Sequence, residues 1–436
     1  MKKVFAVLLS ALMAGSILSA CGDGTSSAPA SSGFASTSEA AAVSGKITFS
    51  AWDVDTQLTY LRPMVEAFEK AYPEVQVEIV DIPSADYSSK LSIDLNGGAA
   101  SDVILVKDAD TMFSLNQKGQ LADMSAYITA DGIDLTAYNG LADNFNFDGQ
   151  QAGMPFRTDY YVLYYNKDIF DAAGVEYPSN DTTWAEFEEL AKQLTSGEGA
   201  NKLYGAHFHT WQALVQNWAV QDGKNTIMGP DYGFMQDAYE MVLRMQNEDK
   251  TIQDFGTLKT ANIHYSGVFQ NGQAAMMPMG SWFMSTMISA VEKGESTVNW
   301  GVATIPHPEG VAAGNTVGAT TPIAINEASE NKEAAWAFVK FMTGEEGAKM
   351  LAEAGQLPGS VNDEYLKIVT SAAGMPEGAQ EALAVKGIVL DRPIVEYVNE
   401  VNKMLEEEHG LIMLGEVSLE DGLAEIATRS KEIQGL

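Results

Sequence analysis

Strand-like and helix-like patterns alternate along residues 46–106, and this alternation restricts the possible folds more than any other feature of the chain. The first helix-like segment has Leu61, Met64 and Phe68 at the spacing of one buried helix face. The predicted strands cover residues 46–52, 75–80 and 102–106, and the predicted helices cover 61–71 and 87–95. Strands that alternate with helices form parallel sheets with right-handed crossovers. The sequence therefore predicts an α/β fold.

Similar patterns continue to the C-terminus. Thr183 and Glu186 form a capping-box pattern, which predicts a helix that ends near Leu194. Further strands are expected at 160–165, 300–305 and 322–325, and further helices at 231–248, 265–271, 281–292, 331–342 and 345–354. The tail from Pro393 is predicted to be mostly helical. Residues 46–436 exceed one ordinary domain and suit two lobes, each with its own core.

The charge of the chain excludes one class of partner. It carries 59 acidic side chains against 26 Lys and Arg, which gives a formal net charge of −33. Binding to nucleic acid requires a basic surface that displaces counterions from the phosphates. We therefore expect no nucleic-acid partner, whereas a neutral ligand would be indifferent to this field.

The N-terminal residues 1–20 have the pattern of a secretory signal. Lys2 and Lys3 precede an apolar stretch that ends at Leu18. This stretch is too short for a comfortable bilayer span of about 20 residues. We therefore expect the chain to be exported and these residues to be removed.

Cys21 is the only cysteine, and it directly follows the small residues Ser19 and Ala20. This context resembles a bacterial lipobox. The resemblance implies cleavage before Cys21, acylation of its thiol with fatty acids such as palmitate, and anchoring at the extracellular face of the cell membrane. That face is the periplasmic side if the organism has an outer membrane. A free cysteine in an ordinary signal peptide is the alternative. Residues 21–45 would then be the lipidated cysteine and a flexible tether, because they are rich in Ser, Ala, Thr and Gly.

Short motifs follow one another in a characteristic order along nearly the whole chain. They are Ala67–Pro73, Gly153–Pro155, Leu163–Phe170, Ala172–Val175, Thr183–Phe187, Phe269–Met276, Met279–Trp282, Asn331–Phe341 and Gly344–Gly347. Each motif is weak alone, but their order and spacing are specific. Together they resemble the extracellular solute-binding proteins of the maltose-binding type, which are the sugar receptors of bacterial ABC importers.

This resemblance implies a two-lobed periplasmic-binding-protein fold of type II, in which each lobe is a mostly parallel sheet flanked by helices and the ligand cleft lies between the lobes. The implied lobes are 46–158 plus 318–367 and 159–317 plus 368–436. It also implies a monomer that is not an enzyme and needs no cofactor. The ligand would be a carbohydrate, and the partners would be ABC permease subunits with a cytoplasmic ATPase. The spread of aromatic candidates along the chain favours an oligosaccharide over a monosaccharide.

Sugars present ring faces of C–H groups and edges of hydroxyls, so a receptor needs aromatic platforms and placed polar groups. Trp52 and Asp53 end the first predicted strand, and Lys107 and Asp108 follow the third, where ligands of parallel sheets bind. We expect Trp52 to stack on the ligand, with ordinary packing as the alternative. Asp53 would accept hydroxyl hydrogen bonds or cap the following helix. Lys107 and Asp108 are further ligand candidates, although charges at strand ends are usually solvated.

Phe156, Arg157 and Asp159 lie where the resemblance places the first crossing between lobes, near residues 157–163. Arg157 and Asp159 are two residues apart on a strand and therefore point to the same face. They would either share a network with ligand hydroxyls or form a plain salt bridge. We expect this segment to contact the ligand.

Trp211 and Trp282 are the other candidates for stacking on a sugar ring. Small residues precede Trp282 and would let backbone and ligand approach closely. The second crossing is expected at 317–322 and the third after the turn at 355–359. Arg392 would either line the cleft or brace the hinge.

Other classes of function were weighed against this one. A secreted enzyme acting on glycosides would use two carboxylates, but no pair is marked out by the sequence, and there is no Gly-x-Ser-x-Gly motif. His207 and His209 share one strand face, but no further set of metal ligands accompanies them, so no metal is expected. A receptor of the same fold that binds a polyamine remains an alternative, although Arg157 in the cleft would count against it.

Overall fold

The computed structural model describes residues 43–107, 109–138, 140–360 and 362–436. Its first elements follow the predicted alternation: β1 (Gly45–Trp52), α1 (Leu61–Ala71), β2 (Val75–Ile82), α2 (Tyr87–Gly97) and β3 (Val103–Leu105). β1 pairs in parallel with β2 and with β3. The apolar face predicted for α1 is buried, including Leu61, Met64 and Phe68. The α/β prediction for this segment is confirmed.

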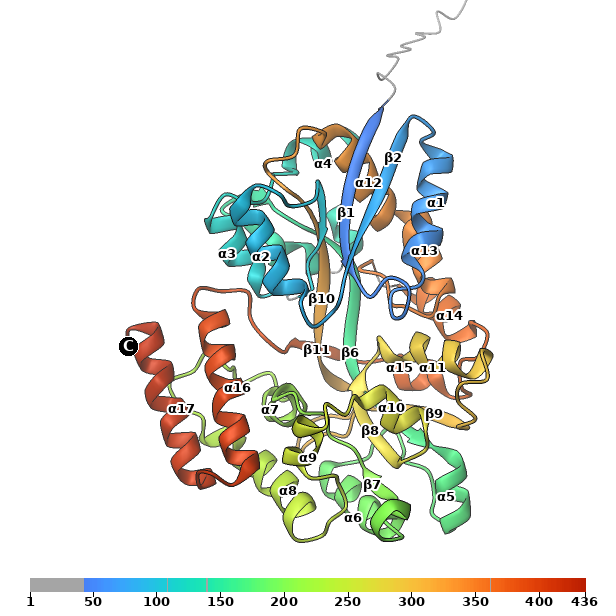
Figure 1. The fold of residues 1–436 in the computed structure, drawn as a ribbon, viewed down its shortest axis with the longest axis vertical. Helices are drawn as coiled ribbons and strands as arrows, with labels where there is room; N and C mark the ends of the chain where they lie inside the picture. Colours follow the sequence, from blue (N-terminus) through green and yellow to red (C-terminus); the bar gives the residue numbers. More distant parts are fainter. Residues whose placement is uncertain (1–42, 108, 139, 361) are drawn as a thin grey trace, which may run out of the picture. The chain divides into compact units, whose positions relative to one another are not determined.

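Two long strands run side by side through the middle of the described part, β6 (Met154–Asn166) and β10 (Asn315–Ile325) (Figure 1). They pair antiparallel, with Gly318 opposite Tyr160 and Ile323 opposite Met154. All 13 residues of β6 are buried. Both strands are longer than the segments predicted at 160–165 and 322–325, because their polar residues are buried by contacts that the sequence pattern does not reveal.

The large sheet has the order β2-β1-β3-β10-β6-β8-β7, and β11 pairs with β10 while β9 pairs with β6. These strands are β7 (Tyr204–Ala206), β8 (Ala274–Gly280), β9 (Trp300–Thr304) and β11 (Gly387–Leu390). A two-stranded sheet is formed by β4 (Asn146–Phe147) and β5 (Gln150–Gln151). β10 is antiparallel to β3, and β6 is antiparallel to β8 and β9. The antiparallel pairings were not predicted, because an apolar run does not specify strand direction.

The helices predicted at 231–248, 265–271, 281–292, 331–342 and 345–354, and the one predicted to end near Leu194, are present with bounds that differ by at most five residues, and the tail is mostly helical as predicted. The helices at 111–117, 125–131, 213–220, 255–260, 363–371 and 379–383 were not predicted. The remaining helices of the fold include both of these groups. They are α3 (Thr111–Gln117), α4 (Ser125–Asp131), α5 (Lys167–Ala173), α6 (Trp184–Leu194), α7 (Ala213–Val220), α8 (Gln236–Asn247), α9 (Phe255–Thr260), α10 (Tyr265–Gln270), α11 (Phe283–Glu292), α12 (Lys332–Thr343), α13 (Glu345–Glu353), α14 (Asp363–Ser371), α15 (Ala379–Leu383), α16 (Val398–Leu414) and α17 (Leu419–Gln434). Short 3₁₀ turns lie at Leu135–Tyr138, Leu141–Phe145, Gly199–Asn201 and Gly233–Met235. The last of these turns replaces the start of the helix predicted at 231–248.

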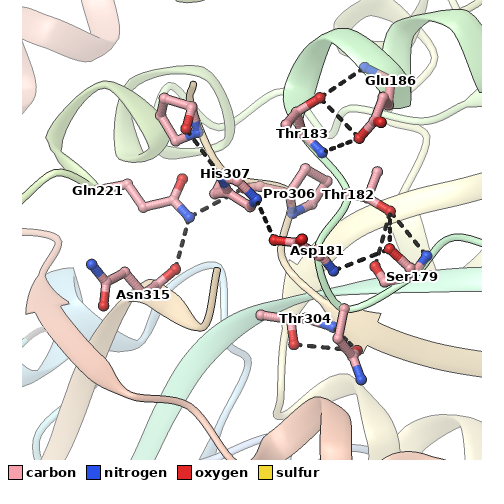
Figure 2. Close-up of polar contacts among 12 residues, drawn as sticks. Ser179, Asp181, Thr182, Thr183, Glu186, Gln221, Thr304, Pro306, His307 and Asn315 are labelled. Atoms are coloured by element: carbon pink, nitrogen blue, oxygen red, sulfur yellow. Dashed lines mark hydrogen bonds and ion pairs between the residues drawn. The ribbon is translucent and has the colours of Figure 1, made fainter. Parts of the chain in front are cut away.

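The capping box predicted at Thr183 is present at the start of α6 (Figure 2). The backbone N–H of Glu186 donates to the Thr183 hydroxyl over 3.2 Å, and the Thr183 N–H donates to the Glu186 carboxylate over 2.8 Å. These bonds satisfy two donors that the first turn of a helix leaves without intrahelical partners.

The buried apolar side chains form two cores. The first contains Phe49, Phe68, Phe156 and Ile323, and we call the part of the chain around it the N-lobe. The second contains Tyr160 and most of the aromatic side chains of the later segments, and we call the part around it the C-lobe. β6 passes from the first core to the second between Phe156 and Tyr160. Ala348, Ala352, Leu357 and Tyr365 pack in the second core, although the resemblance placed their segment in the N-lobe.

Cys21 and nearly all of the predicted tether lie outside the described residues, as does the predicted signal. None of the helices in the described ranges is both long and apolar enough to cross a bilayer.

Candidate functional site

Arg157 and Asp159 lie on β6 where the strand passes between the two cores. The Arg157 Nε atom is 2.7 Å from the Asp159 Oδ2 atom, and the two side chains are only 7% and 5% exposed. The contact is an ion pair without hydrogen-bond geometry, because Nε has no hydrogen-bond partner among the described residues. The structure thus brings together two residues that strand alternation placed on one face.

Side chains from distant parts of the chain complete a polar network around this pair. Arg157 Nη1 donates to the Tyr60 hydroxyl over 2.6 Å and to Gln356 Oε1 over 3.3 Å. Asp159 Oδ1 accepts a hydrogen bond of 3.0 Å from the Ser281 hydroxyl. Tyr60 directly precedes α1, whereas Ser281 directly follows β8. The network therefore connects the N-lobe to the C-lobe through the strand that joins them.

Burial is the largest influence on the pKa values of the residues in this network. Burial raises the pKa of Asp159, and the positive charge of Arg157 opposes that rise. Burial also raises the pKa of Tyr60 to about 12, so its hydroxyl stays protonated at neutral pH. The site therefore offers a phenol, an amide and a paired charge, all shielded from bulk water.

Five rings beside this network form what we call the aromatic cluster: His209, Trp211, His264, Tyr265 and Trp282. The Trp211 and Tyr265 ring centroids are 5.5 Å apart, and those of Trp211 and Trp282 are 6.4 Å apart. The Trp282 indole N–H donates to the Tyr265 hydroxyl over 3.2 Å. Trp211 is 38% exposed, which is unusual for so large an apolar ring. Two of the three tryptophans predicted to stack on a ligand, Trp211 and Trp282, therefore lie in one cluster.

Asp53 approaches the aromatic cluster from the N-lobe. Its backbone is in the left-handed region, with φ of 45°, and its carboxylate accepts a hydrogen bond of 3.0 Å from the Ser84 N–H. Burial lowers the pKa of His264, and the charge of Asp53 opposes that shift, which places the two groups within electrostatic range. Asp53 does not cap α1, since that helix begins eight residues later, at Leu61. The capping alternative for Asp53 is therefore wrong.

A cavity of about 50 Å³ lies beside β10. On this edge of β10, β11 pairs with residues 315–318 and β3 pairs with residues 323–325. Residues 319–321 have neither strand beside them. The charged and polar lining of the cavity includes Lys107, Asp110, Thr320 and Arg392. Arg392 Nη1 is 3.7 Å from Asp110 Oδ2, so this ion pair links the segment after β11 to the start of α3. Lys107 Nζ donates to the Ser84 carbonyl and hydroxyl, each over 2.8 Å. Arg392 thus has a place in the cavity lining and an ion pair between segments, which fit the two alternatives expected for it, lining the cleft and bracing the hinge.

Besides Asp53, four of the predicted site residues that the structure describes belong neither to the aromatic cluster nor to the polar network around Arg157. Trp52 and Phe156 belong to the first core, and Lys107 and Arg392 line the cavity beside β10. Trp52 is only 6% exposed and its ring packs 5.2 Å from that of Tyr87, so it has the packing role that was the alternative to stacking. Phe156 is 1% exposed and belongs to the first core. Asp108 lies outside the described residues. The rings of Trp52 and Phe156 are buried because they pack among the apolar side chains of the N-lobe core.

In the described ranges, no group of three or more His, Cys, Asp or Glu side chains is placed to hold a metal ion.

Residues 52–349 match the model of one protein family, the bacterial extracellular solute-binding proteins. The chain belongs to this family. Its members are binding proteins, and its name places them outside the cytoplasm.

This solute-binding protein is similar in sequence and in structure to several known proteins. A maltooligosaccharide ABC transporter solute-binding lipoprotein of Streptococcus pneumoniae is 27% identical over 359 residues, which cover 80% of this chain and 78% of the relative. A sugar transporter of Rhizobium etli, solved in an open conformation, is 38% identical with a TM-score of 0.76, covering 89% of this chain and 99% of that one. An ABC substrate-binding protein of Listeria monocytogenes in complex with cycloalternan is 26% identical with a TM-score of 0.77, covering 90% and 100%.

Several residues of the site in this solute-binding protein were not predicted from the sequence. Tyr60, Ser281 and Gln356 are ordinary polar residues at the ends of elements, and nothing in their local pattern marks them. Tyr265 begins α10 and has the spacing of a buried helix face. His209 was considered only as a metal ligand, although its neighbour Trp211 was already a stacking candidate.

Proposed function

We propose that this protein captures a neutral carbohydrate between its lobes, at the aromatic cluster and the Arg157–Asp159 network, and delivers it to the permease of an ABC importer. The observation that carries the proposal is the position of Trp211, Tyr265 and Trp282 directly beside a buried polar network. Aromatic faces suit the C–H faces of sugar rings, and the planar guanidinium and carboxylate groups suit hydroxyl edges.

The lobes give this site a mechanism of capture. Tyr60 and Asp53 come from the N-lobe, whereas Ser281 and the aromatic cluster come from the C-lobe. A ligand that contacts both sets of groups stabilises the arrangement in which they lie close together. The permease subunits, which work with a cytoplasmic ATPase, would recognise that arrangement.

The cavity at Lys107 and Arg392 lies beside the same crossing strands and is a candidate extension of the site. Tyr161 connects the two regions: its ring lies 5.6 Å from that of Trp282, and Asp391 and Arg392 act on its ionisation. Burial raises the pKa of Tyr161 well above its usual value, and Asp391 adds to the rise. A ligand longer than one sugar unit would reach from the aromatic cluster toward this cavity, which favours an oligosaccharide.

Thermal unfolding of the full-length protein in detergent, with and without ligand, tests the proposal. A ligand present at 100 times its dissociation constant stabilises the folded state by about 2.7 kcal/mol. We expect a rise in Tm with maltooligosaccharides, lactose or cycloalternan and none with putrescine or spermidine. A rise with the polyamines alone would identify a receptor for cations. Hydrolysis of the sugars during incubation would identify an enzyme.

Replacement of one ring locates the binding site. Trp282→Ala removes a face of the aromatic cluster and should weaken sugar binding at least about tenfold, the equivalent of 1.4 kcal/mol. Tyr177→Ala is the matched control, because Tyr177 packs its ring against Tyr165 of the C-lobe core, is 41% exposed and lies outside the cluster. Isothermal titration of both variants measures the difference. Unchanged affinity in Trp282→Ala would remove the cluster from the proposal.

The membrane anchor is a separate part of the proposal. We infer that the mature protein begins at an acylated Cys21, which holds it at the extracellular face of the membrane and leaves it monomeric there. Two or more acyl chains on one residue give stable anchoring. Cys21→Ser should move the protein from the detergent phase to the aqueous phase in a phase-partition assay. Retention of the serine variant in the detergent phase would contradict lipidation at this residue.

A further inference from the structure

The five histidines of the chain differ in whether their ring nitrogens are paired. Both ring nitrogens of His307 have partners, the Pro308 carbonyl at 3.0 Å and Asp181 at 3.3 Å (Figure 2). His409 Nδ1 lies 3.0 Å from the Tyr239 hydroxyl, and His264 Nδ1 lies 2.6 Å from the Ser266 hydroxyl. His207 Nε2 and His209 Nδ1 are buried without a hydrogen-bond partner among the described residues. A buried polar atom left in this way costs about 1–3 kcal/mol, so these two call for an explanation.

His209 occupies the centre of the aromatic cluster. Its ring lies edge-on to Trp211 with centroids 4.7 Å apart, and 5.2 Å from the ring of Tyr265. His264 lies 5.5 Å away on another side. Trp211 and His264 are the exposed members of the cluster, so movement of either ring would open a path to the His209 ring.

His207 has a different position. It is 1% exposed, and its backbone N–H donates to the Met276 carbonyl of β8 over 2.9 Å. Its ring lies 6.3 Å from that of His209, and its side chain is more deeply buried. A ligand that reaches His209 would therefore not contact His207 first.

We propose that His209 is a specificity-determining residue of the binding site, whose unpaired Nδ1 forms a hydrogen bond with one hydroxyl group of the bound sugar. This inference rests on the proposed function. A neutral imidazole has one donor and one acceptor nitrogen, and a hydroxyl can complement either one. Sites that bond a ligand hydroxyl reject analogues without it far more strongly than apolar pockets reject a size change, because the site's own polar group is then left unpaired.

The electrostatics of the cluster keep this imidazole neutral. Burial, reinforced by the nearby His207 and His264, lowers the pKa of His209 to about 3. It therefore stays uncharged at any pH at which the protein would meet a sugar. A neutral ring also does not attract anionic solutes, which agrees with a neutral ligand.

Isothermal titration with monodeoxy sugars tests this role. The probes are maltose to maltoheptaose, lactose and cycloalternan, followed by monodeoxy derivatives of the tightest binder. In wild-type full-length protein, one monodeoxy derivative should bind about 10- to 100-fold more weakly than the parent sugar. His209→Phe should weaken the parent by a similar factor and bind that derivative about as well as the wild type does. His209→Gln, which keeps a hydrogen-bonding group, should restore part of the discrimination.

His307→Phe is the matched control, because His307 is a buried C-lobe histidine that lies outside the cluster and has both nitrogens paired. It should keep the wild-type ranking of parent and derivatives. Equal loss for every sugar in His209→Phe would show a general packing role and overturn the inference, as would unchanged affinity for the parent. If sugars bind the wild type and His209→Phe keeps its ranking, only the inference on His209 is wrong. If none of the sugars binds the folded wild type, the proposed function is wrong and this inference falls with it.

Discussion

At the scale of single residues, the buried charges of Arg157 and Asp159 stand out because charges are rarely buried without cause. Removing two charges from water costs several kcal/mol each, and their attraction repays this cost only with good geometry and further hydrogen bonds. Here the further bonds come from Tyr60, Gln356 and Ser281. The pair lies where the chain passes between the lobes. The two desolvated charges are therefore located where we propose that a polar ligand binds.

The first prediction concerns this pair. Asp159→Asn leaves the Arg157 guanidinium buried without its counter-charge and should reduce the free energy of unfolding by about 3–5 kcal/mol. Urea titration followed by circular dichroism measures the change. Asp55→Asn is the control, because Asp55 pairs with Arg62 on the surface, where the two side chains are 64% and 47% exposed. Solvent and salt screen that pair, so its loss should change the free energy of unfolding far less than loss of the buried pair. Equal effects of the two substitutions would mean that the buried pair is not held as described.

The second prediction concerns pH. Burial lowers the pKa of His207 to about 4 and of His209 and His409 to about 3, below the value of 6.5 of a free histidine. A histidine with a lowered folded-state pKa contributes its full stability above pH 6.5 and loses it as the pH falls toward the folded-state pKa. At pH 5, 1.5 units below 6.5, each should have lost about 2 kcal/mol. Urea titrations at pH 7 and pH 5 measure this loss.

His409→Gln separates one of these contributions. Glutamine can still bond with the Tyr239 hydroxyl but does not titrate. The difference between pH 7 and pH 5 should therefore be about 2 kcal/mol smaller in this variant than in the wild type. Carboxylates with lowered pKa values, such as Asp102, lose their contribution only at lower pH. An equal difference in both proteins would show that His409 is not buried in the neutral form.

For single residues, the sequence predicted contacts only between partners that are close together in the chain. Arg157 and Asp159 are two positions apart, so strand alternation alone placed them on one face. Tyr60 lies 97 residues from Arg157, Gln356 lies 199 residues from it, and Ser281 lies 122 residues from Asp159. No local sequence pattern indicates contacts between residues that are so far apart in the chain. Trp52 was given a stacking role because it ends a strand, but the depth of the core below that strand is set by tertiary packing.

At the scale of elements, β6 and β10 determine how the lobes are joined. β6 was predicted only at 160–165 because Arg157, Thr158 and Asp159 interrupt the apolar run that continues on either side. β10 contains Pro322, and its register with β6 shifts between Thr321 and Pro322. A proline has no N–H for the ladder, so a strand that contains one in its interior usually has a bulge there. The family resemblance implied that these segments cross between lobes, but the direction and register of the strands depend on partners far along the chain.

The third prediction concerns the packing between these strands. A Cβ atom at Gly318 would lie 2.5 Å from the Asp159 carbonyl oxygen and 2.8 Å from Ile388 Cγ2. The first neighbour is backbone, so Gly318→Ala requires the strands to move apart and should reduce the free energy of unfolding by about 1–3 kcal/mol. Displacement of Asp159 should also weaken sugar binding.

Gly410→Ala is the control for this substitution. Gly410 lies in the interior of α16, and a Cβ atom there has no neighbour within 4 Å. Alanine should stabilise that helix by about 0.5–1 kcal/mol. Chemical denaturation gives both values. A neutral Gly318→Ala would show that the β6–β10 contact is looser than described.

At the scale of the whole molecule, the two cores and the strands that join them explain the location of the site. Each core is large enough to support a stable lobe, and both contribute groups to one polar and aromatic region. The net charge of −33 leaves neutral ligands unaffected while it keeps the protein away from other anions. The resemblance to maltose-type solute-binding proteins, carried by the order of motifs along nearly the whole chain, implied this two-lobed architecture. It did not reveal the depth of the site, which depends on how the lobes meet.

The central claim is that a carbohydrate binds between the lobes against the aromatic cluster. A crystal structure of the protein with the oligosaccharide that raises its Tm most tests this claim directly. We predict a sugar ring packed on Trp282 or Trp211, with hydroxyls bonded to the Arg157–Asp159 network and to His209. A sugar bound elsewhere, with the cluster and the network as they are without ligand, would contradict the account.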